Sequence, residues 1–426
     1  MSGSTRELPF HRDDRGSRSG FVSRSTARWR RTRRGLAVIV VGVVALAAIV
    51  TSRTVVAEDV RVADRASLEE ALRSARPGTT ILLAPGDYDG GLRAERLAGK
   101  EGAPIVIRAA DAESPPRIRG GRNALHLSDA VHVEIRDLVI EKCATNGMNV
   151  DDGGSFETPS AHVTFRGVTF RDIGSGGNHD GLKLSGVVDF RVEDCRFERW
   201  GRGGSGIDMV GCHRGVIDAS TFREGDPQGA NAVQMKGGSR DITVRRCRFE
   251  DAGGRGVNLG GSTGLPYFRP RPEGYEAKDL VVEDCVFVGG GAPVAFVGVD
   301  GATVRHNVIY HPGRWVLRIL QETRGEDFVP SRNGRFESNI VVYRSSDVRT
   351  LVNIGDGTDP ASFRFSGNLW FCADRPERSE AGARSLPTSE KDGIYGKDPR
   401  FEDPAKGDFG VPAGSAAFGR GPRVRS

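Results

Sequence analysis

The sequence predicts an all-β fold, a single right-handed parallel β-helix of about 9–11 coils that occupies residues 58–375. Two observations predict it: a short motif that recurs along the chain, and a composition suited to short strands. Of the 426 residues, 58 are glycine, and aromatic residues make up only 7%. Abundant glycine with a lean apolar content is typical of many short strands joined by tight turns.

The recurring motif places an apolar residue at the end of a short strand. Segments 195–197, 247–249 and 285–287 read Cys-Arg-Phe, Cys-Arg-Phe and Cys-Val-Phe, and weaker copies lie between and beyond them. A second alternating strand follows most copies, so the motif predicts two strands in each coil. Because one such unit cannot bury its apolar face alone, neighbouring units are expected to stack.

Stacking turns equivalent residues into columns. The position two residues before each apolar residue is expected to face the interior, where small cysteines pack as buried hydrophobic residues rather than as disulfides. Asparagine amides in such a column are expected to hydrogen-bond from coil to coil. The column comprises Leu138, Val168, Cys195, Ser220, Cys247, Cys285, Asn307, Asn339 and Asn368.

Both ends of the β-helix differ from the repeat. Residues 67–70 read Ser-Leu-Glu-Glu, a capping-box sequence that predicts a short helix running to about Ala75 and covering the first coil. Residues 376–426 lose the repeat and gain proline, glycine and charge. They are expected to form an irregular C-terminal cap or strap.

The N-terminal tail, residues 1–57, carries the basic charge of the chain. It holds 11 arginines against three acidic residues, whereas the remainder has a net charge of −3, which argues against a nucleic-acid partner. Five arginines precede an apolar run at 36–52, typical of a cleaved signal peptide or of a retained single membrane anchor. Either alternative predicts a secreted, periplasmic or cell-surface monomer.

Two further segments carry a resemblance to known proteins. Segment 77–88 with segment 104–109 is similar to the opening of chondroitinase-B-like and alginate-lyase-like proteins, and segment 398–409 resembles the closing segment of secreted β-helix proteins. Together with the repeat, they make the chain resemble the pectate-lyase-like superfamily. The resemblance implies the fold and an extracellular polysaccharide. It carries over no catalytic residue, because the Arg-x-Pro-x-x-Arg and Glu-x-Glu patterns of that superfamily are missing.

Alternation along each second strand predicts a polar row on the outside of the β-helix. With Leu182 and Leu184 inside, Lys183 points outward. This row is expected to line a groove for a sugar chain, with Asn149, Asp208, Gln234 and Asn258 binding substrate. The same register gives His126, Asn149, Lys183, Asp208, Gln234, Asn258, Ala295, Arg318 and Asn353.

A uronate-containing glycan would be cleaved there by β-elimination. The C5 proton becomes removable once the neighbouring carboxylate is neutralised by Ca²⁺ or arginine. Lys183 or Lys236 is the predicted base, provided that its surroundings lower its pKa, and Arg318 is the predicted carboxylate clamp. His179, in the turn before Lys183, is a proton carrier suited to a C5-epimerase.

Calcium is the predicted cofactor, held by hard oxygen donors from Asp151, Asp180 and Asp208. Two insertions are expected to form opposite walls of the groove: residues 150–160 and residues 262–278. Tyr267 in the longer insertion would stack on a sugar ring, and Arg269 would pair with an acidic group.

Three functions remain open at this point. The first is a lyase acting on an acidic polysaccharide. The second is another enzyme on the same scaffold, either a C5-epimerase or a glycoside hydrolase that uses Asp180 and Asp208 as its two carboxylates. The third is a non-catalytic β-helix that binds glycan or serves the cell envelope.

Overall fold

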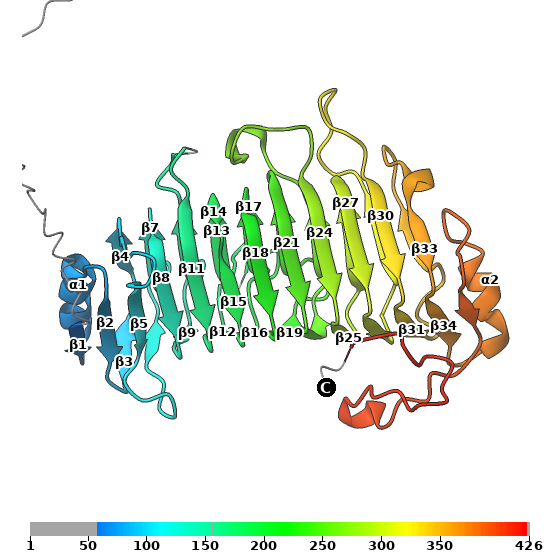
Figure 1. The fold of residues 1–426 in the computed structure, drawn as a ribbon, viewed down its shortest axis with the longest axis horizontal. Coiled ribbons are helices and arrows are strands. Elements are labelled where there is room, and N and C mark those ends of the chain that lie inside the picture. The colour runs from blue at the N-terminus through cyan, green and yellow to red at the C-terminus, as the bar shows by residue number, and fades with distance from the viewer. Residues whose placement is uncertain (1–57, 156, 175, 424–426) are drawn as a thin grey trace, which may run out of the picture. The chain divides into compact units, whose positions relative to one another are not determined.

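The computed structural model describes residues 58–423 apart from residues 156 and 175. Each turn of the described chain contributes strands to three parallel sheets, which we call sheets A, B and C (Figure 1). Sheet A has 13 strands, sheet B has 12 and sheet C has 10. The ten strands of sheet C mark ten complete coils, which confirms the predicted stack of 9–11.

The strands of the three sheets have the following bounds. Sheet A contains β1 (Glu58–Val62), β2 (Thr79–Leu83), β5 (Ile105–Ala109), β8 (Val131–Arg136), β11 (Ser160–Arg166), β14 (Val187–Val188), β15 (Arg191–Glu193), β18 (His213–Asp218), β21 (Ser239–Arg245), β24 (Ala277–Glu283), β27 (Val299–Arg305), β30 (Arg332–Glu337) and β33 (Arg364–Ser366). Sheet B contains β3 (Asp87–Asp89), β6 (Arg117–Arg119), β9 (Val139–Glu141), β12 (Thr169–Arg171), β16 (Arg196–Glu198), β19 (Thr221–Gly225), β22 (Arg248–Ala252), β25 (Val286–Val288), β28 (Val308–Tyr310), β31 (Ile340–Tyr343), β34 (Leu369–Cys372) and β35 (Ile394–Tyr395). Sheet C contains β4 (Leu92–Glu95), β7 (Leu125–Ser128), β10 (Met148–Asp151), β13 (Leu182–Ser185), β17 (Ser205–Val210), β20 (Asn231–Lys236), β23 (Arg255–Gly260), β26 (Ala292–Val297), β29 (Leu317–Leu320) and β32 (Val352–Ile354).

Each coil has three strands, so the prediction of two was wrong. The predicted first strand bends at a corner between sheet A and sheet B. Asp194, Arg246 and Asp284, just before the three motif cysteines, adopt φ angles of 53°, 53° and 55°. This left-handed conformation ends one strand and turns the chain into the next.

The interior is built from columns, as predicted. Five phenylalanines on β12, β16, β19, β22 and β25 stack with ring centroids 4.5–5.0 Å apart, close to the spacing of neighbouring strands. The described cysteines are free and buried. In the polar part of the column, Asn307 Nδ2 donates to Asn339 Oδ1 at 2.9 Å, and Asn339 Nδ2 donates to Asn368 Oδ1 at 2.9 Å. Glu390 then accepts from Asn368 Nδ2 at 2.7 Å and ends the ladder.

The N-terminal helix α1 (Arg65–Ser74) covers the first coil, as predicted, but it begins three residues earlier. Its capping box is formed by Asp64 and Ser67, not by Ser67 and Glu70. The Asp64 carboxylate accepts from the backbone N of Ser67 at 2.8 Å, and Ser67 Oγ accepts from the backbone N of Asp64 at 3.2 Å. The helix buries Leu68 and Leu72.

The C-terminal segment forms the predicted strap. After β34 it contains the short helices η3 (Pro376–Arg378), α2 (Ser379–Ala383) and η4 (Pro404–Lys406), and it runs back beside sheet B (Figure 1). Arg423, near its end, pairs with Asp284 at 2.8 Å. The strap therefore spans several coils and holds them together.

Several loops lie on one edge of the stack, where the chain passes from sheet C to sheet A (Figure 1). The two long loops follow β23 and β29, and η1 (Leu265–Tyr267) lies in the first of them; shorter loops follow β10 and β32, and η2 (Pro360–Ser362) lies in the one after β32. Fully buried Glu276 ties the two long loops together, since it accepts hydrogen bonds from Thr263 and Thr323. Within the described residues no helix is both long and apolar enough to cross a membrane. The predicted segment 36–52 lies outside them.

Candidate functional site

The predicted row is in register along the whole of sheet C, but three of its members, Asp208, Asn258 and Ala295, are buried. Across successive strands of sheet C, His126 lies opposite Asn149, Asn149 opposite Lys183, and so on to the end of the sheet. Because the pairing is in register, these side chains leave the same face of the sheet. The row continues through Asp208, Gln234, Asn258, Ala295, Arg318 and Asn353.

Four charged residues meet at the middle of this row, and we call them the lysine–aspartate cluster: Lys183, Lys236, Asp180 and Asp208. Asp208 pairs with both lysines, directly with Lys183 and at 3.2 Å with Lys236 Nζ. Asp180 Oδ2 lies 3.4 Å from Lys183 Nζ. The side chains of Lys183 and Lys236 are 25% and 12% exposed, whereas those of Asp180 and Asp208 are 2% and 1% exposed. The carboxylates therefore lie beneath the ammonium groups.

The two aspartates have different proton affinities. Burial, reinforced by the nearby Asp208 charge, raises the pKa of Asp180 to about 6 against the opposing effect of Lys183. Burial also acts to raise the pKa of Asp208, but Lys183 and Lys236 outweigh it and hold that pKa below its ordinary value. Asp208 is therefore ionised at neutral pH, whereas Asp180 exchanges its proton near pH 6.

Lys183 does not meet the condition set for a base. Burial acts to lower its pKa, but Asp208 and Asp180 outweigh burial and raise the pKa above the ordinary value. The expectation of a lowered pKa was wrong because Asp208 and Asp180, which the sequence already placed near this lysine, are buried beneath it. Lys183 stays a cation in the resting protein.

Asp180 also belongs to a backbone ladder at the corner between sheets B and C. Asn123 Oδ1 accepts from the backbone N of Asn146 at 3.3 Å, and Asn146 Oδ1 accepts from the backbone N of Asp180 at 2.8 Å. Asp180 Oδ1 accepts from the backbone N of Ser205 at 2.8 Å. Asn123 and Asn146 accept the equivalent hydrogen bonds in the two preceding coils, so the ladder does not require a charge at position 180.

The predicted calcium ligands do not come together. Asp151 is held elsewhere on sheet C, by His126 Nε2 at 2.5 Å and by Ser128 Oγ at 2.8 Å, while Asp180 and Asp208 are occupied by lysines. Among residues 58–423, with 156 and 175 left aside, no three His, Cys, Asp or Glu side chains are placed to hold a metal. The three aspartates therefore do not fit one calcium site, and we derive no step through that ion.

The sequence did not predict the His126–Asp151 pair. Burial acts to raise the pKa of Asp151, but the hydrogen bonds from His126 and Ser128 outweigh it and lower this pKa to about 2. His126 was visible in the outer row, and Ser128 and Asp151 are paired in the next row. Only the rotation of the His126 ring toward Asp151 required the structure.

His179 is the chain neighbour of Asp180, whereas Arg318 lies far from the cluster along sheet C. The His179 ring packs in the turn before β13 so closely that a side chain at Gly174 would meet its Nδ1 at 2.6 Å. Among the residues described, His179 makes no hydrogen bond or ion pair with Lys183. Arg318 lies five strands from Lys183 and donates from Nε to Asn353 Oδ1 at 2.9 Å. Arg318 is therefore too far away to act on a carboxylate that is held at Lys183.

The two insertions do not form opposite walls. Arg269 in the longer insertion pairs with Asp152 in the shorter one, and both lie on the same edge of sheet C. The predicted arrangement failed because both insertions follow strands of the same sheet. Arg269 is thus engaged within the protein, while the Tyr267 side chain projects into solvent, with an exposed fraction of 72%.

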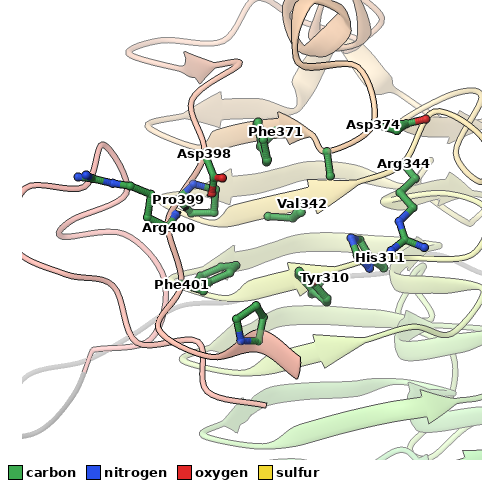
Figure 2. A pocket seen from close by; sticks show the side chains of 12 residues that line it. Tyr310, His311, Val342, Arg344, Phe371, Asp374, Asp398, Pro399, Arg400 and Phe401 are labelled. Atoms are coloured by element: carbon green, nitrogen blue, oxygen red, sulfur yellow. Dashed lines mark hydrogen bonds between the residues drawn. The ribbon is translucent and has the colours of Figure 1, made fainter. Parts of the chain in front are cut away.

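A pocket of about 490 Å³ lies between sheet B and the C-terminal strap, away from the cluster. Figure 2 shows the strap residues Asp398 and Phe401 beside Tyr310, Val342 and Phe371, which occupy successive strands of sheet B. Tyr310 and Phe401 have ring centroids 6.2 Å apart. The pocket is therefore a seam between strap and sheet.

Comparison with known proteins agrees with this architecture. The family model described as a right handed beta helix region matches residues 123–269 and 156–313, the coils from β7 to β28. The chain is a right-handed parallel β-helix protein. No curated protein matches this β-helix protein.

Solved structures similar to the β-helix protein include three carbohydrate-active proteins. An alginate lyase from Paenibacillus sp. str. FPU-7 is 18% identical with a TM-score of 0.46, over 71% of this chain and 97% of that one. The A-module of a mannuronan C-5 epimerase from Azotobacter vinelandii is 16% identical with a TM-score of 0.49, over 79% and 92%. A pectate lyase is 14% identical with a TM-score of 0.40, over 70% and 69%.

Proposed function

We propose that this β-helix protein acts outside the cytoplasm on a uronate-containing polysaccharide and cleaves it by β-elimination. The glycan would lie across the outer face of sheet C. The observation that carries the proposal is the lysine–aspartate cluster, in which two partly exposed ammonium groups cover two buried carboxylates. The basic and then apolar N-terminal segment supports the location.

The charge of the cluster suits an anionic sugar. Lys183 and Lys236 supply two positive charges, and Asp208 supplies one negative charge. Asp180 adds another negative charge only above a pH of about 6. The cluster is therefore net positive at mildly acid pH and neutral above it, and a sugar carboxylate is expected to bind more tightly as the pH falls.

The same groups supply what an elimination needs. A carboxylate seated on Lys183 and Lys236 is neutralised, which makes the C5 proton of its sugar removable. That proton passes to Lys183 as Lys183 hands one of its own to ionised Asp180, 3.4 Å away. The C5–H electron pair forms the C4–C5 double bond, the C4–O bond breaks, and the leaving oxygen takes a proton from water. The hydroxide so formed takes the proton from Asp180, which returns the cluster to its starting state.

A second candidate is glycan binding without cleavage. The raised pKa of Lys183 favours it, because a lysine that holds its proton firmly is a poor base. In this case the cluster would still recognise carboxylates. Binding and cleavage therefore have to be measured separately.

The test uses the full chain with polymannuronate, polygalacturonate, a glucuronate-containing glycan and a neutral glucan, each with calcium and with a chelator. Ultraviolet absorbance of an unsaturated product supports the lyase, and we expect Lys183→Gln to abolish it. The matched control is Lys278→Gln, an exposed lysine on sheet A. Reducing ends without absorbance, or binding alone, would refute cleavage by elimination, and failure to bind any acidic glycan would refute the whole proposal.

A further inference from the structure

A second charged group lies on the outer face of sheet C, toward its C-terminal coils. It consists of Arg255 in β23, Arg318 in β29, and Arg314 and Trp315 in the turn before β29, and we call it the arginine–tryptophan patch. The guanidinium carbons of Arg314 and Arg318 lie 4.0 and 4.4 Å from the centroid of the Trp315 ring. Three arginines and one aromatic ring therefore share a small area.

The positive charge of this patch is only partly balanced. Arg255 pairs with Glu322 at 2.5 Å and donates to Asn258 Oδ1 at 3.1 Å. Arg318 donates to a neutral amide, that of Asn353. In the described part of the chain, no carboxylate forms an ion pair with Arg314 or Arg318. One carboxylate thus faces three guanidinium groups.

Arg318 is also partly withdrawn from water. Burial is the main cause that lowers the pKa of Arg318, and the like charge of Arg255 is the next. Cations that are held together with little solvent are unfavourable unless an anion joins them. The patch therefore has the electrostatics of an anion site.

The patch also has the shape that an acidic sugar requires. A planar guanidinium that stacks on an indole ring, as those of Arg314 and Arg318 do on Trp315, presents its N–H edge, and this edge binds a carboxylate through two parallel hydrogen bonds. Arg318 stands in the same outer row as Lys183, five strands further along. The separation is about 24 Å at the spacing of neighbouring strands.

We infer that the arginine–tryptophan patch is a distal carboxylate-binding subsite on the same outer face of sheet C as the lysine–aspartate cluster. The inference rests on the proposed function, since it assumes that an acidic glycan lies along sheet C. One ring of an extended sugar chain spans roughly one coil, so about five sugars separate the two sites. Oligosaccharides of about six or more sugars reach both sites, and shorter ones reach one.

The test compares acidic oligosaccharides of about three and about eight sugars, lengths chosen on either side of the span between the sites. Binding to the full chain is followed by calorimetry and by tryptophan emission on rapid mixing, before turnover. The longer oligosaccharide is expected to bind at least about ten-fold more tightly than the shorter one. Arg318→Gln is expected to remove this advantage and to leave the shorter oligosaccharide unaffected.

Two further variants locate the effect. Of the tryptophans that the structure describes, Trp315 is partly exposed, whereas Trp200 and Trp370 are buried, so Trp315→Phe is expected to abolish the change in emission caused by the longer oligosaccharide. Arg335→Gln, which removes an exposed arginine from sheet A in β30, is the matched control and is expected to bind both lengths normally. Circular dichroism shows whether each variant is folded.

The outcomes separate the inference from the proposed function. Equal affinity for the two lengths, or an unchanged advantage in Arg318→Gln, overturns the distal subsite while the function stands if Lys183→Gln still weakens binding. A neutral octasaccharide that binds as tightly as the acidic one also overturns it. If neither acidic length binds, both proposals fail together.

Discussion

The outer face of sheet C differs from the outer faces of sheets A and B in how it places charge. On sheets A and B, arginines pair with acids that are partly exposed, as Asp189 is beside Arg214, or sheltered, as Asp218 is beside Arg245 and Arg246 with 5% of its side chain exposed. In both cases the arginines hold the pKa of the carboxyl below its ordinary value. On sheet C, Asp208 is nearly fully buried beneath Lys183 and Lys236.

This difference separates two uses of charge on one scaffold. Exposed pairs are screened by water and contribute about 0–1 kcal/mol each, so they mainly keep the faces soluble. Buried carboxylates under cations are costly to assemble and titrate at unusual pH values. A face that keeps such a cluster is therefore the face on which to look for function.

The largest expected effect comes from removing the carboxylate that both lysines share. Asp208→Ala leaves Lys183 and Lys236 crowded together without their common partner, and we expect a loss of about 3–5 kcal/mol in the free energy of unfolding. Urea denaturation followed by circular dichroism measures it. A loss below about 1 kcal/mol would show that the cluster is solvated like the exposed pairs on sheets A and B.

The next effect depends on pH through Asp180. Its pKa is about 6 in the folded chain and 3.8 as the ordinary value, so the folded state holds the proton more tightly. Stability contributed by this group is therefore present below pH 3.8 and is lost as the pH rises to about 6. We expect the free energy of unfolding of the unmodified chain to fall by about 1–3 kcal/mol over this pH range through Asp180, and we expect Asp180→Asn not to show this fall. Urea denaturation at several pH values measures it.

The same variant tests the binding proposal. Asparagine keeps the backbone ladder, because Asn123 and Asn146 make the equivalent hydrogen bonds in the neighbouring coils. In Asp180→Asn, the affinity for an acidic glycan is expected to stay constant as the pH rises through 6. The variant is also expected not to cleave the glycan. Unchanged pH dependence would assign the titration to another group.

An effect of similar size and opposite sign is expected at Asp151. Its pKa is lowered to about 2 from 3.8, so its contribution is present above pH 3.8 and is lost as the pH falls toward 2. Asp151→Asn should reduce stability at neutral pH by about 2 kcal/mol and flatten the acid limb of the stability curve. An acid limb equal to that of the unmodified chain would contradict the His126–Asp151 interaction.

The smallest effect is expected on the exposed faces. Asp189→Ala removes the partner of Arg214, whose side chain is 53% exposed, and we expect a change of at most about 0.5–1 kcal/mol. Added salt should reduce the difference further, since exposed pairs are screened. A loss as large as that in Asp208→Ala would erase the distinction between the faces.

The sequence by itself determined which residues share a column. Alternation along a strand is a local property with a period of two, and the repeat sets the stacking register, so the interior column and the row from His126 to Asn353 could both be predicted. The Asn307–Asn339–Asn368 ladder and the free cysteines follow from the same two facts.

Only the tertiary structure decided what each outward residue touches. The left-handed corner at Asp194 lies within a segment whose sequence resembles one continuous strand. The burial of Asp208 depends on Lys183 and Lys236, which come from the coils on either side. Asp151 contacts His126 in the preceding coil instead of joining Asp180 as a calcium ligand. This too is a choice between neighbouring coils. Burial and proton affinity arise from contacts between segments that are distant in the chain, and no local pattern encodes them.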